Sequence, residues 1–350
     1  MAAYRILTFN WHDPYLHMLA KTGHGLEVGD WMGRADGTRG WDLQKRPKPQ
    51  NVNLLENPRD AADLLSSGAY DLALCHTLQD LSFVAPFDVP TVFLTHNSLR
   101  NDGVDDHKRM AKFRDEVEGY LTDRKATFAA ISQMKLDSWQ LDGHVVLPGI
   151  DLEDYGGYTG DDASALSVGN LFVERDFMLG YRYLSQILDG LPHRLVGENP
   201  GLPHAQKAGS WEDLKQAYRG CRAYVNATVE AFEDGYNLGM LEAMATGMPV
   251  VTYANRTSPV VDGENGYLSD DVDVLRQRVE TLLADPDRAR VMGEAARRTV
   301  AESFSVKQFV ATWNQVFEAC LTKAGGKGGS RMDTSKHRPG VDDAPELCPD

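Results

Sequence analysis

Two carboxylates, Asp234 and Glu242, are separated by seven residues in the stretch DGYNLGMLEAMATGMPVV. A carboxylate only accepts hydrogen bonds, so a pair at this spacing could hold the hydroxyl groups of a sugar or a ribose. The competing interpretation is that both acids complement the positive end of a helix dipole, as acids near helix starts commonly do. The chemistry of the stretch therefore depends on where its helix begins.

The residues between the two acids predict a helix start near Asn237 or Leu238. A helix start exposes backbone N–H groups and the positive end of the dipole, which together favour an anion. Gly235 and Gly239 have no side chain and would let a diphosphate approach the backbone closely. With Tyr236, these residues form a candidate anion-binding segment.

A candidate cation for the same anion is Arg175, in SVGNLFVERDF. A guanidinium can bind phosphate oxygens through two parallel hydrogen bonds. Asn170 precedes it by five residues and offers only a neutral donor. The competing interpretation of Arg175 is a surface salt bridge with the neighbouring Glu174 or Asp176.

Two histidines end predicted strands, His76 after YDLALC and His96 after TVFLT. Asn10 and His12 follow the first predicted strand in the same way. Ligands of open parallel sheets bind outside the carboxyl ends of the strands, so these side chains should line a cleft. A histidine at a strand end is also often a structural residue, and both interpretations stay open.

Two sheets are needed to position these residues. Short apolar segments alternate with helical ones, which is typical of parallel sheets covered by helices on both faces. The first helix should have Asp13 as its N-cap and a proline at its first position. A division near Gly149–Asp154 gives an α/β fold of two doubly wound domains, residues 1–150 and 151–322, facing a central cleft. The predicted strand segments are YRILTFN, YDLALCH, TVFLTH, ATFAAIS, HVVLPGI, ALSVGNL, HRLVGEN, RAYVNAT and PVVTY.

Length and charge narrow the function classes. A chain of 350 residues is long enough for two ordinary domains. Its net charge of −15 argues against general affinity for nucleic acid. The basic cluster in residues 108–114 is followed at once by acids, so membrane contact should be peripheral and weak at most. The sequence has no apolar run of about 18 residues and no secretory signal, which predicts a cytoplasmic protein.

No pattern in the sequence indicates a metal or a cofactor. The cysteines are dispersed, and the acidic groups DGVDD, GDDAS and SDDVD are typical of solvated turns. We therefore expect reduced thiols, no metal site and no required cofactor. Residues 323–350 are rich in Gly, Pro, Ser and charge and predict a disordered tail.

Several motifs of the second half resemble the donor-binding domain of retaining glycosyltransferase family 4, also described as glycosyl transferases group 1. Four segments carry this resemblance in order: DGYNLGMLEAMATGMPVV, SPVVDGENGYL, LLADPDRARVMGEAARRTV and FSVKQFVATWNQVF. It spans about residues 129–320. The resemblance implies the GT-B fold, in which two Rossmann-like domains bind acceptor and nucleotide-sugar donor, and in which the last helix crosses back to the first domain.

The resemblance also implies roles for individual residues. Family members carry two glutamates separated by seven residues: the first approaches the transferred sugar and the second holds the ribose. By spacing, these roles fall to Asp234 and Glu242, or to Glu230 in place of Asp234 if the loop is longer. The cations that neutralise the leaving diphosphate correspond to Asn170 and Arg175, so one charge is missing.

Histidines of this family lie near the donor sugar or acceptor. That role falls best to His96, with His76, Asn10 and His12 along the cleft. The implied reaction is retaining, metal-independent hexosyl transfer from a UDP- or GDP-sugar by front-face attack, as in polysaccharide or glycoconjugate biosynthesis. Sugar, lipid-linked and small-molecule acceptors are all compatible with the sequence.

Two other functions are compatible with the same residues. A catalytically silent nucleotide-sugar-binding protein would be consistent with the neutral Asn170. A nucleotide-sugar epimerase of the same architecture would need a second cluster of acids and bases, which the sequence does not show. A dehydrogenase is disfavoured, because no G-x-G-x-x-G follows the first strand.

Overall fold

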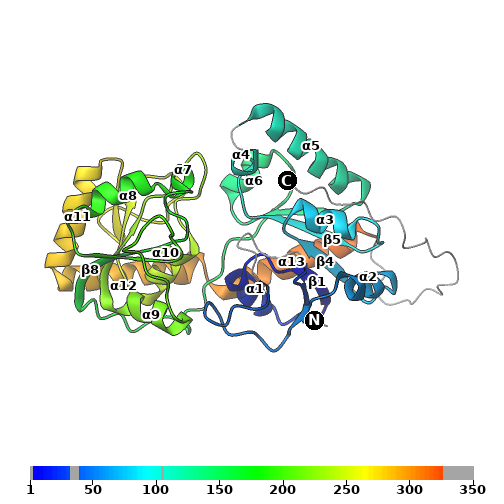
Figure 1. Ribbon diagram of the computed structural model, residues 1–350, viewed down its shortest axis with the longest axis horizontal. Helices are drawn as coiled ribbons and strands as arrows, with labels where there is room; N and C mark the ends of the chain where they lie inside the picture. Colours follow the sequence, from blue (N-terminus) through cyan, green and yellow to red (C-terminus); the bar gives the residue numbers. More distant parts are fainter. Residues whose placement is uncertain (1–2, 32–38, 104–105, 326–350) are drawn as a thin grey trace.

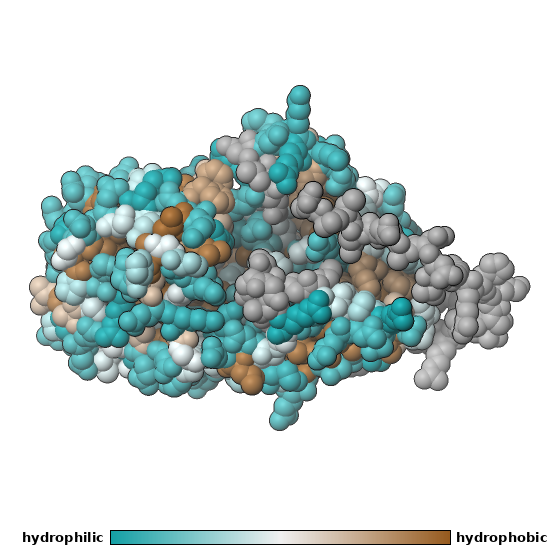
Figure 2. Space-filling model, viewed as in Figure 1, coloured by the Kyte–Doolittle hydropathy of each residue, from teal (hydrophilic) through white to brown (hydrophobic). Residues whose placement is uncertain are grey.

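The computed structural model describes residues 3–31, 39–103 and 106–325. The described chain forms two parallel sheets, and Figure 1 shows the two units side by side with helices packed around each. This architecture confirms the predicted α/β class and the GT-B arrangement. In the same view, polar residues cover most of the visible face, and the surface is indented between the units (Figure 2). The sequence predicts the tail at residues 323–350, but Lys323 still belongs to the last helix, and residues 326–350 lie outside the described residues.

The first sheet has seven parallel strands in the order β3-β2-β1-β4-β5-β6-β7. Strands β4, β5 and β6 are buried along their whole length, as their continuous apolar sequences predict. The order reverses at β1, which pairs with β2 on one side and β4 on the other. Such a reversal is where open sheets of this kind usually bind ligands. The strands are β1 (Arg5–Phe9), β2 (Gly25–Gly29), β3 (Val52–Leu55), β4 (Leu72–Cys75), β5 (Thr91–Thr95), β6 (Thr127–Ala130) and β7 (His144–Val145).

Helix α1 corrects one expectation about the first domain. Its N-cap is His12, not Asp13, and Asp13 is a buried residue of the first turn. Because Asp13 is already the first residue of the helix and its side chain is buried in the domain, it does not take the N-cap position. The helices of this domain are α1 (Asp13–Ala20), α2 (Pro58–Ser66), α3 (Leu78–Val84), α4 (Leu99–Gly103), α5 (His107–Asp123) and α6 (Gln133–Trp139).

The second sheet has five parallel strands in the order β12-β11-β10-β8-β9. Its strands are β8 (Asp162–Val168), β9 (His193–Val196), β10 (Cys221–Asn226), β11 (Val250–Tyr253) and β12 (Gly266–Ser269). The helices that surround it are α7 (Asp176–Leu179), α8 (Tyr181–Leu188), α9 (Trp211–Gly220), α10 (Leu238–Thr246), α11 (Val272–Ala284) and α12 (Pro286–Ser303). Strands β2, β3 and β12 were not among the predicted segments, because GLEVG, VNLL and GYLS contain Gly or polar residues and are only partly buried, so they lack the continuous apolar run of β4 to β6.

The last helix, α13 (Val306–Lys323), packs against the first sheet although it follows the second. Its Trp313 and Phe317 are fully buried in the same core as residues of β1, β4 and β5. Figure 1 shows α13 among the elements of the first domain. The chain thus crosses between domains twice, and the crossings touch: the N–H of Val306 donates to the carbonyl of Ile150 at 3.0 Å. The domains are joined by these two adjacent segments.

Candidate functional site

The predicted helix start is confirmed. Helix α10 begins at Leu238 with Asn237 as its N-cap. The Asn237 side-chain oxygen accepts the N–H of Met240 at 2.8 Å, and its amide nitrogen donates to Asn226 at 3.1 Å. Because Asn226 ends strand β10, one side chain fixes the helix start to the carboxyl edge of the sheet.

The glycines of this segment are required for packing within the protein. A Cβ on Gly239 would lie 2.9 Å from the Tyr224 hydroxyl, and one on Gly235 would lie 2.5 Å from the backbone nitrogen of Ser258. Tyr236 is buried in the core of the second domain. In the structure, Gly235, Tyr236 and Gly239 of the candidate anion-binding segment therefore have a packing role. The sequence pattern could not distinguish this role from contact with a ligand.

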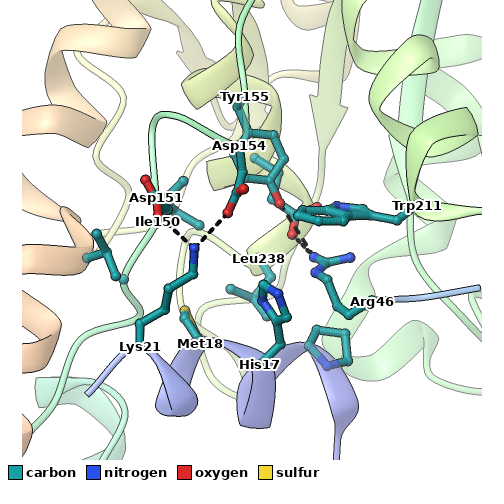
Figure 3. Close-up of a pocket in the computed structure, with 14 residues that line it drawn as sticks. His17, Met18, Lys21, Arg46, Ile150, Asp151, Asp154, Tyr155, Trp211 and Leu238 are labelled. Atoms are coloured by element: carbon teal, nitrogen blue, oxygen red, sulfur yellow. Dashed lines mark hydrogen bonds and ion pairs between the residues drawn. The ribbon is translucent and has the colours of Figure 1, made fainter. Parts of the chain in front are cut away.

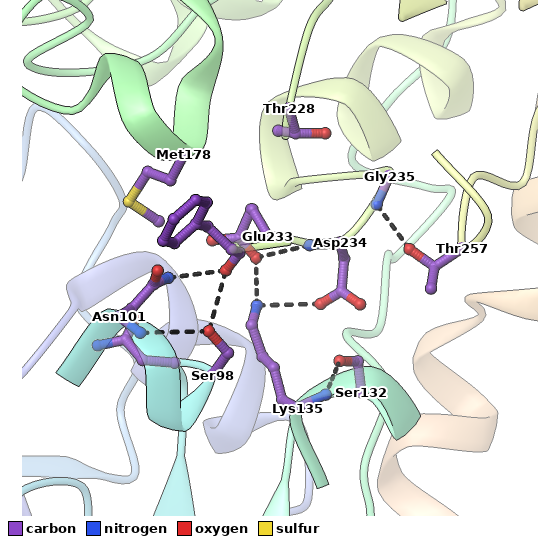
Figure 4. A network of polar contacts seen from close by, with 12 residues as sticks. Ser98, Asn101, Ser132, Lys135, Met178, Thr228, Glu233, Asp234, Gly235 and Thr257 are labelled. Carbon is purple, nitrogen blue, oxygen red and sulfur yellow. Dashed lines mark hydrogen bonds and ion pairs between the residues drawn. The ribbon is translucent and has the colours of Figure 1, made fainter. Parts of the chain in front are cut away.

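Asp234 lies in a buried ion cluster that spans the two domains (Figure 4). Lys135 of helix α6 contacts the carboxylates of both Glu233 and Asp234, with its Nζ 3.0 Å from Asp234 Oδ2. The Lys135 side chain is only 4% exposed. The other oxygen of Asp234, Oδ1, is buried and accepts no hydrogen bond from the described residues. That oxygen is available to a hydroxyl of a bound molecule.

The first domain also holds the loop that carries these acids. Ser98 Oγ and Asn101 Nδ2 donate to the carbonyl of Phe232, at 3.2 Å and 2.8 Å (Figure 4). Glu230, the alternative to Asp234, is directed elsewhere: it pairs with the exposed Arg256. In this structure Glu233 and Asp234 thus share the cluster, and Glu230 lies outside it.

Glu242 is buried and bound from both domains, beside the pocket in which Figure 3 shows Arg46 next to Trp211. Its Oε1 pairs with Arg46, and its Oε2 accepts the Tyr218 hydroxyl at 3.0 Å. The Arg46 guanidinium lies 4.7 Å from the centre of the Trp211 ring. The cavity beside them measures about 30 Å³, which is room for water but not for a nucleoside. A ribose could reach Glu242 only if Arg46 moved.

The expected phosphate-binding residues lie on the loop after β8. Asn170 Oδ1 accepts the N–H of Glu198 at 2.8 Å, so its amide ties two neighbouring loops together. Arg175 Nη2 lies 3.3 Å from Met178 Sδ. Asp176 pairs with a different arginine, and among the described residues Arg175 forms no salt bridge. Its guanidinium is therefore not committed to a carboxylate there.

The two strand-end histidines are hydrogen-bonded to each other. His76 Nδ1 and His96 Nε2 are 3.0 Å apart, and His76 Nε2 is 3.0 Å from Thr8 Oγ1. His96 stacks on Trp11 at 4.1 Å between ring centres and meets the edge of Tyr15 at 4.7 Å. Both imidazoles are buried, and burial lowers the pKa of His76 to about 3 and that of His96 well below its usual value. Both rings are therefore neutral at physiological pH.

These histidines should make stability depend on pH. Below about pH 6.5 an unfolded histidine takes up a proton that buried His76 refuses until about pH 3, so folding loses about 1.4 kcal/mol per pH unit in that window. Asp80 acts in the opposite direction, because burial raises its pKa to about 6 and its carboxyl is protonated first in the fold. From pH 7.5 to 5.0, we expect wild type to lose about 2 kcal/mol more than His76→Gln in urea unfolding. Equal losses in the two proteins would contradict this assignment.

The remaining cleft candidates lie after β1. The Asn10 amide donates to Asp30 Oδ1 at 2.6 Å and to the carbonyl of Gly40 at 3.3 Å. Its own oxygen is buried and has no partner among the described residues. His12 contacts the edge of the Trp11 ring. Asn10 is thus a second buried acceptor at the carboxyl edge of the first sheet.

The remaining observations concern the basic helix α5, membrane-spanning segments and metal ligands. The basic residues of α5 are partly neutralised locally, with Lys112 3.7 Å from Glu116 and Arg114 2.9 Å from Asp115. No helix within the described ranges is long and apolar enough to span a bilayer. Those ranges also contain no group of three or more His, Cys, Asp or Glu side chains arranged to hold a metal ion.

Four site residues escaped the sequence analysis: Lys135, Arg46, Tyr218 and Trp211. Lys135 carried a usable signal, because AAISQMK reads as a strand followed by a serine N-cap, and Ser132 does accept the N–H of Lys135. Arg46 lies in the loop between β2 and β3, and no helix or strand pattern in the sequence predicts where its side chain lies. Its contact with Glu242 joins residues 196 positions apart, a separation that no local pattern spans.

Parts of this chain are similar to known proteins. Residues 189–285 match the family model described as "Glycosyl transferases group 1". A segment of 165 residues, 45% of this chain, is 30% identical to the MMP alpha-(1->4)-mannosyltransferase of Mycolicibacterium hassiacum and covers 39% of that protein. A shorter segment of 75 residues, 20% of this chain, is 40% identical to the GDP-mannose-dependent alpha-(1-6)-phosphatidylinositol monomannoside mannosyltransferase of Mycolicibacterium smegmatis and covers 20% of it. The matches thus span less than half of these relatives.

Solved structures extend the likeness to the whole fold. The Anabaena HepE structure, determined with UDP and glucose, superposes with a TM-score of 0.67 at 15% identity, over 90% of this chain and 100% of that one. At this identity the comparison establishes the fold alone.

Proposed function

Because the chain has the GT-B fold and residues 189–285 match the family model of group 1 glycosyl transferases, we propose that it is a retaining hexosyltransferase using a nucleotide-sugar donor. The observation that carries the proposal is the placement of Asp234 and Glu242. Both carboxylates lie beside the carboxyl edge of the second sheet, and each is contacted by a cation of the first domain. Buried Asp234 Oδ1 still lacks a donor among the described residues.

Each residue then has a chemical task. Arg175 and the start of α10 stabilise the charge that grows on the leaving diphosphate. Glu242 holds the ribose after Arg46 moves aside, and Asp234 fixes the transferred sugar. His96 and Asn10 line the acceptor side, with the imidazole neutral. The leaving phosphate assists deprotonation of the acceptor in a front-face attack, so no side-chain nucleophile, metal or cofactor takes part.

The names of the relatives support the finer parts of the proposal. The two mannosyltransferases make alpha linkages, and one is GDP-mannose-dependent. HepE has also been solved with UDP-glucose. A common hexose donor of this kind is alpha-linked to its diphosphate, so an alpha product keeps the configuration. We therefore expect a UDP- or GDP-hexose donor and a sugar, lipid-linked or small-molecule acceptor.

The test is nucleoside diphosphate release from UDP-, GDP-, ADP- and dTDP-sugars, with and without mixed acceptors from cell extract. Wild type should use one nucleotide, and Asp234→Asn should lower its turnover about 100-fold. Asp161→Asn is the matched control, because it removes a carboxylate from an exposed loop at the amino end of β8. Donor binding without release would favour a silent nucleotide-sugar-binding protein, and no binding of any donor would refute both functions.

A further inference from the structure

The carboxylate that the proposed function assigns to the transferred sugar is not positioned by its own domain. Asp234 lies on the loop before α10, whereas its partner Lys135 lies in the first turns of α6, in the other domain. Figure 4 shows the lysine side chain reaching from α6 to both acids of the loop. The sugar-facing acid is therefore completed only when the two domains meet.

The contacts distribute the oxygens of Asp234 unequally. Lys135 holds Oδ2 at 3.0 Å, and Oδ1 is buried without a partner among the described residues. Glu233 braces the arrangement, because its Oε1 contacts Lys135 and also accepts the N–H of Asp234 at 3.0 Å. One oxygen is thus fixed and the other is left to accept a bond.

The charge of the cluster also fits this role. One ammonium group faces two carboxylates, so the cluster keeps a net negative charge. A hydroxyl group that donates a hydrogen bond to the remaining carboxylate oxygen would stabilise this charge. Burial by itself lowers the pKa of Lys135, but Glu233 and Asp234 outweigh burial and raise it. The lysine therefore stays charged throughout the neutral range.

Resting on the proposed function, we propose that Lys135 is a positioning residue that orients Asp234 across the domain boundary so that Oδ1 receives a hydroxyl of the donor sugar. Lys135 acts through Asp234 and contacts no reacting atom. Its removal should affect the sugar part of the donor and leave the nucleotide part bound as before. A purely structural ion pair would show no such selectivity.

Titration calorimetry of nucleotide sugar against the matching nucleoside diphosphate tests this selectivity. In Lys135→Met, we expect the nucleotide sugar to bind at least tenfold more weakly and kcat to fall about 100-fold. Affinity for the nucleoside diphosphate, which has no sugar, should stay within about threefold. Lys135→Arg keeps the positive charge, and its kcat should be at least tenfold higher than that of Lys135→Met.

Two further variants separate positioning from stability. The double variant Lys135→Met with Glu233→Gln leaves fewer unpaired buried charges than Lys135→Met alone. It should therefore be more stable to unfolding than the single variant, with the same low kcat. Arg5→Met breaks a different ion pair, Arg5–Glu27, at the amino end of β1, and should leave both affinities unchanged. Equal weakening of nucleotide sugar and nucleoside diphosphate, or unchanged binding of both, would overturn the role of Lys135. A wild type that binds no nucleotide would instead refute the proposed function.

Discussion

Gly293→Ala is expected to destabilise the protein by about 3 kcal/mol or more. Gly293 lies inside α12, which packs against α10, and a Cβ at this position would overlap the carbonyl oxygen of Gly247. Backbone atoms cannot turn aside as a side chain can, so the two helices would have to separate. Gly247 is itself the left-handed C-cap of α10, with φ 99°, and is poorly able to shift.

The matched control for this substitution is Gly119→Ala. Gly119 is exposed on α5, and an added Cβ would meet nothing within 4 Å. Alanine is the better helix former, so this variant should gain about 0.5–1 kcal/mol. Urea unfolding of both variants measures the contrast. A Gly293→Ala variant as stable as wild type would mean that α10 and α12 do not approach each other this closely.

Arg46→Met is expected to cost about 3–5 kcal/mol of folding stability. The side chains of Arg46 and Glu242 are only 8% and 5% exposed. Without the guanidinium, the Glu242 carboxylate keeps the neutral hydroxyls of Tyr218 and Tyr155 but no cation to offset its lost hydration. Most of this loss of stability comes from the Glu242 carboxylate, which remains buried without a cation, and less of it from the lost contact itself.

A double-mutant cycle tests that origin. Adding Glu242→Gln to Arg46→Met removes the buried charge, so the double variant should recover a large part of the lost stability. Arg194→Met is the surface control: its pair with Asp162 leaves the arginine side chain 58% exposed, and its loss should cost less than about 1 kcal/mol. If Arg46→Met unfolds at the same urea concentration as Arg194→Met, the buried pair does not stabilise the domain contact.

The sequence by itself determined the features that depend on neighbouring residues. Short apolar runs predicted β4, β5 and β6, and Asn237 predicted the start of α10. The spacing of Asp234 and Glu242 placed both acids beside that start. These are local properties, because strand burial, helix capping and side-chain spacing follow from residues a few positions apart.

Only the tertiary structure decided what these residues face. Lys135 meets Glu233 across 98 positions and Arg46 meets Glu242 across 196, so neither pair exists until both domains have folded and met. The short strands β2, β3 and β12 are likewise defined by pairing with neighbouring strands. Packing against Tyr224 and Ser258 decided the roles of two glycines that looked like ligand contacts. The sequence located the two acids, and the opposing domain supplied the cation that engages one oxygen of each.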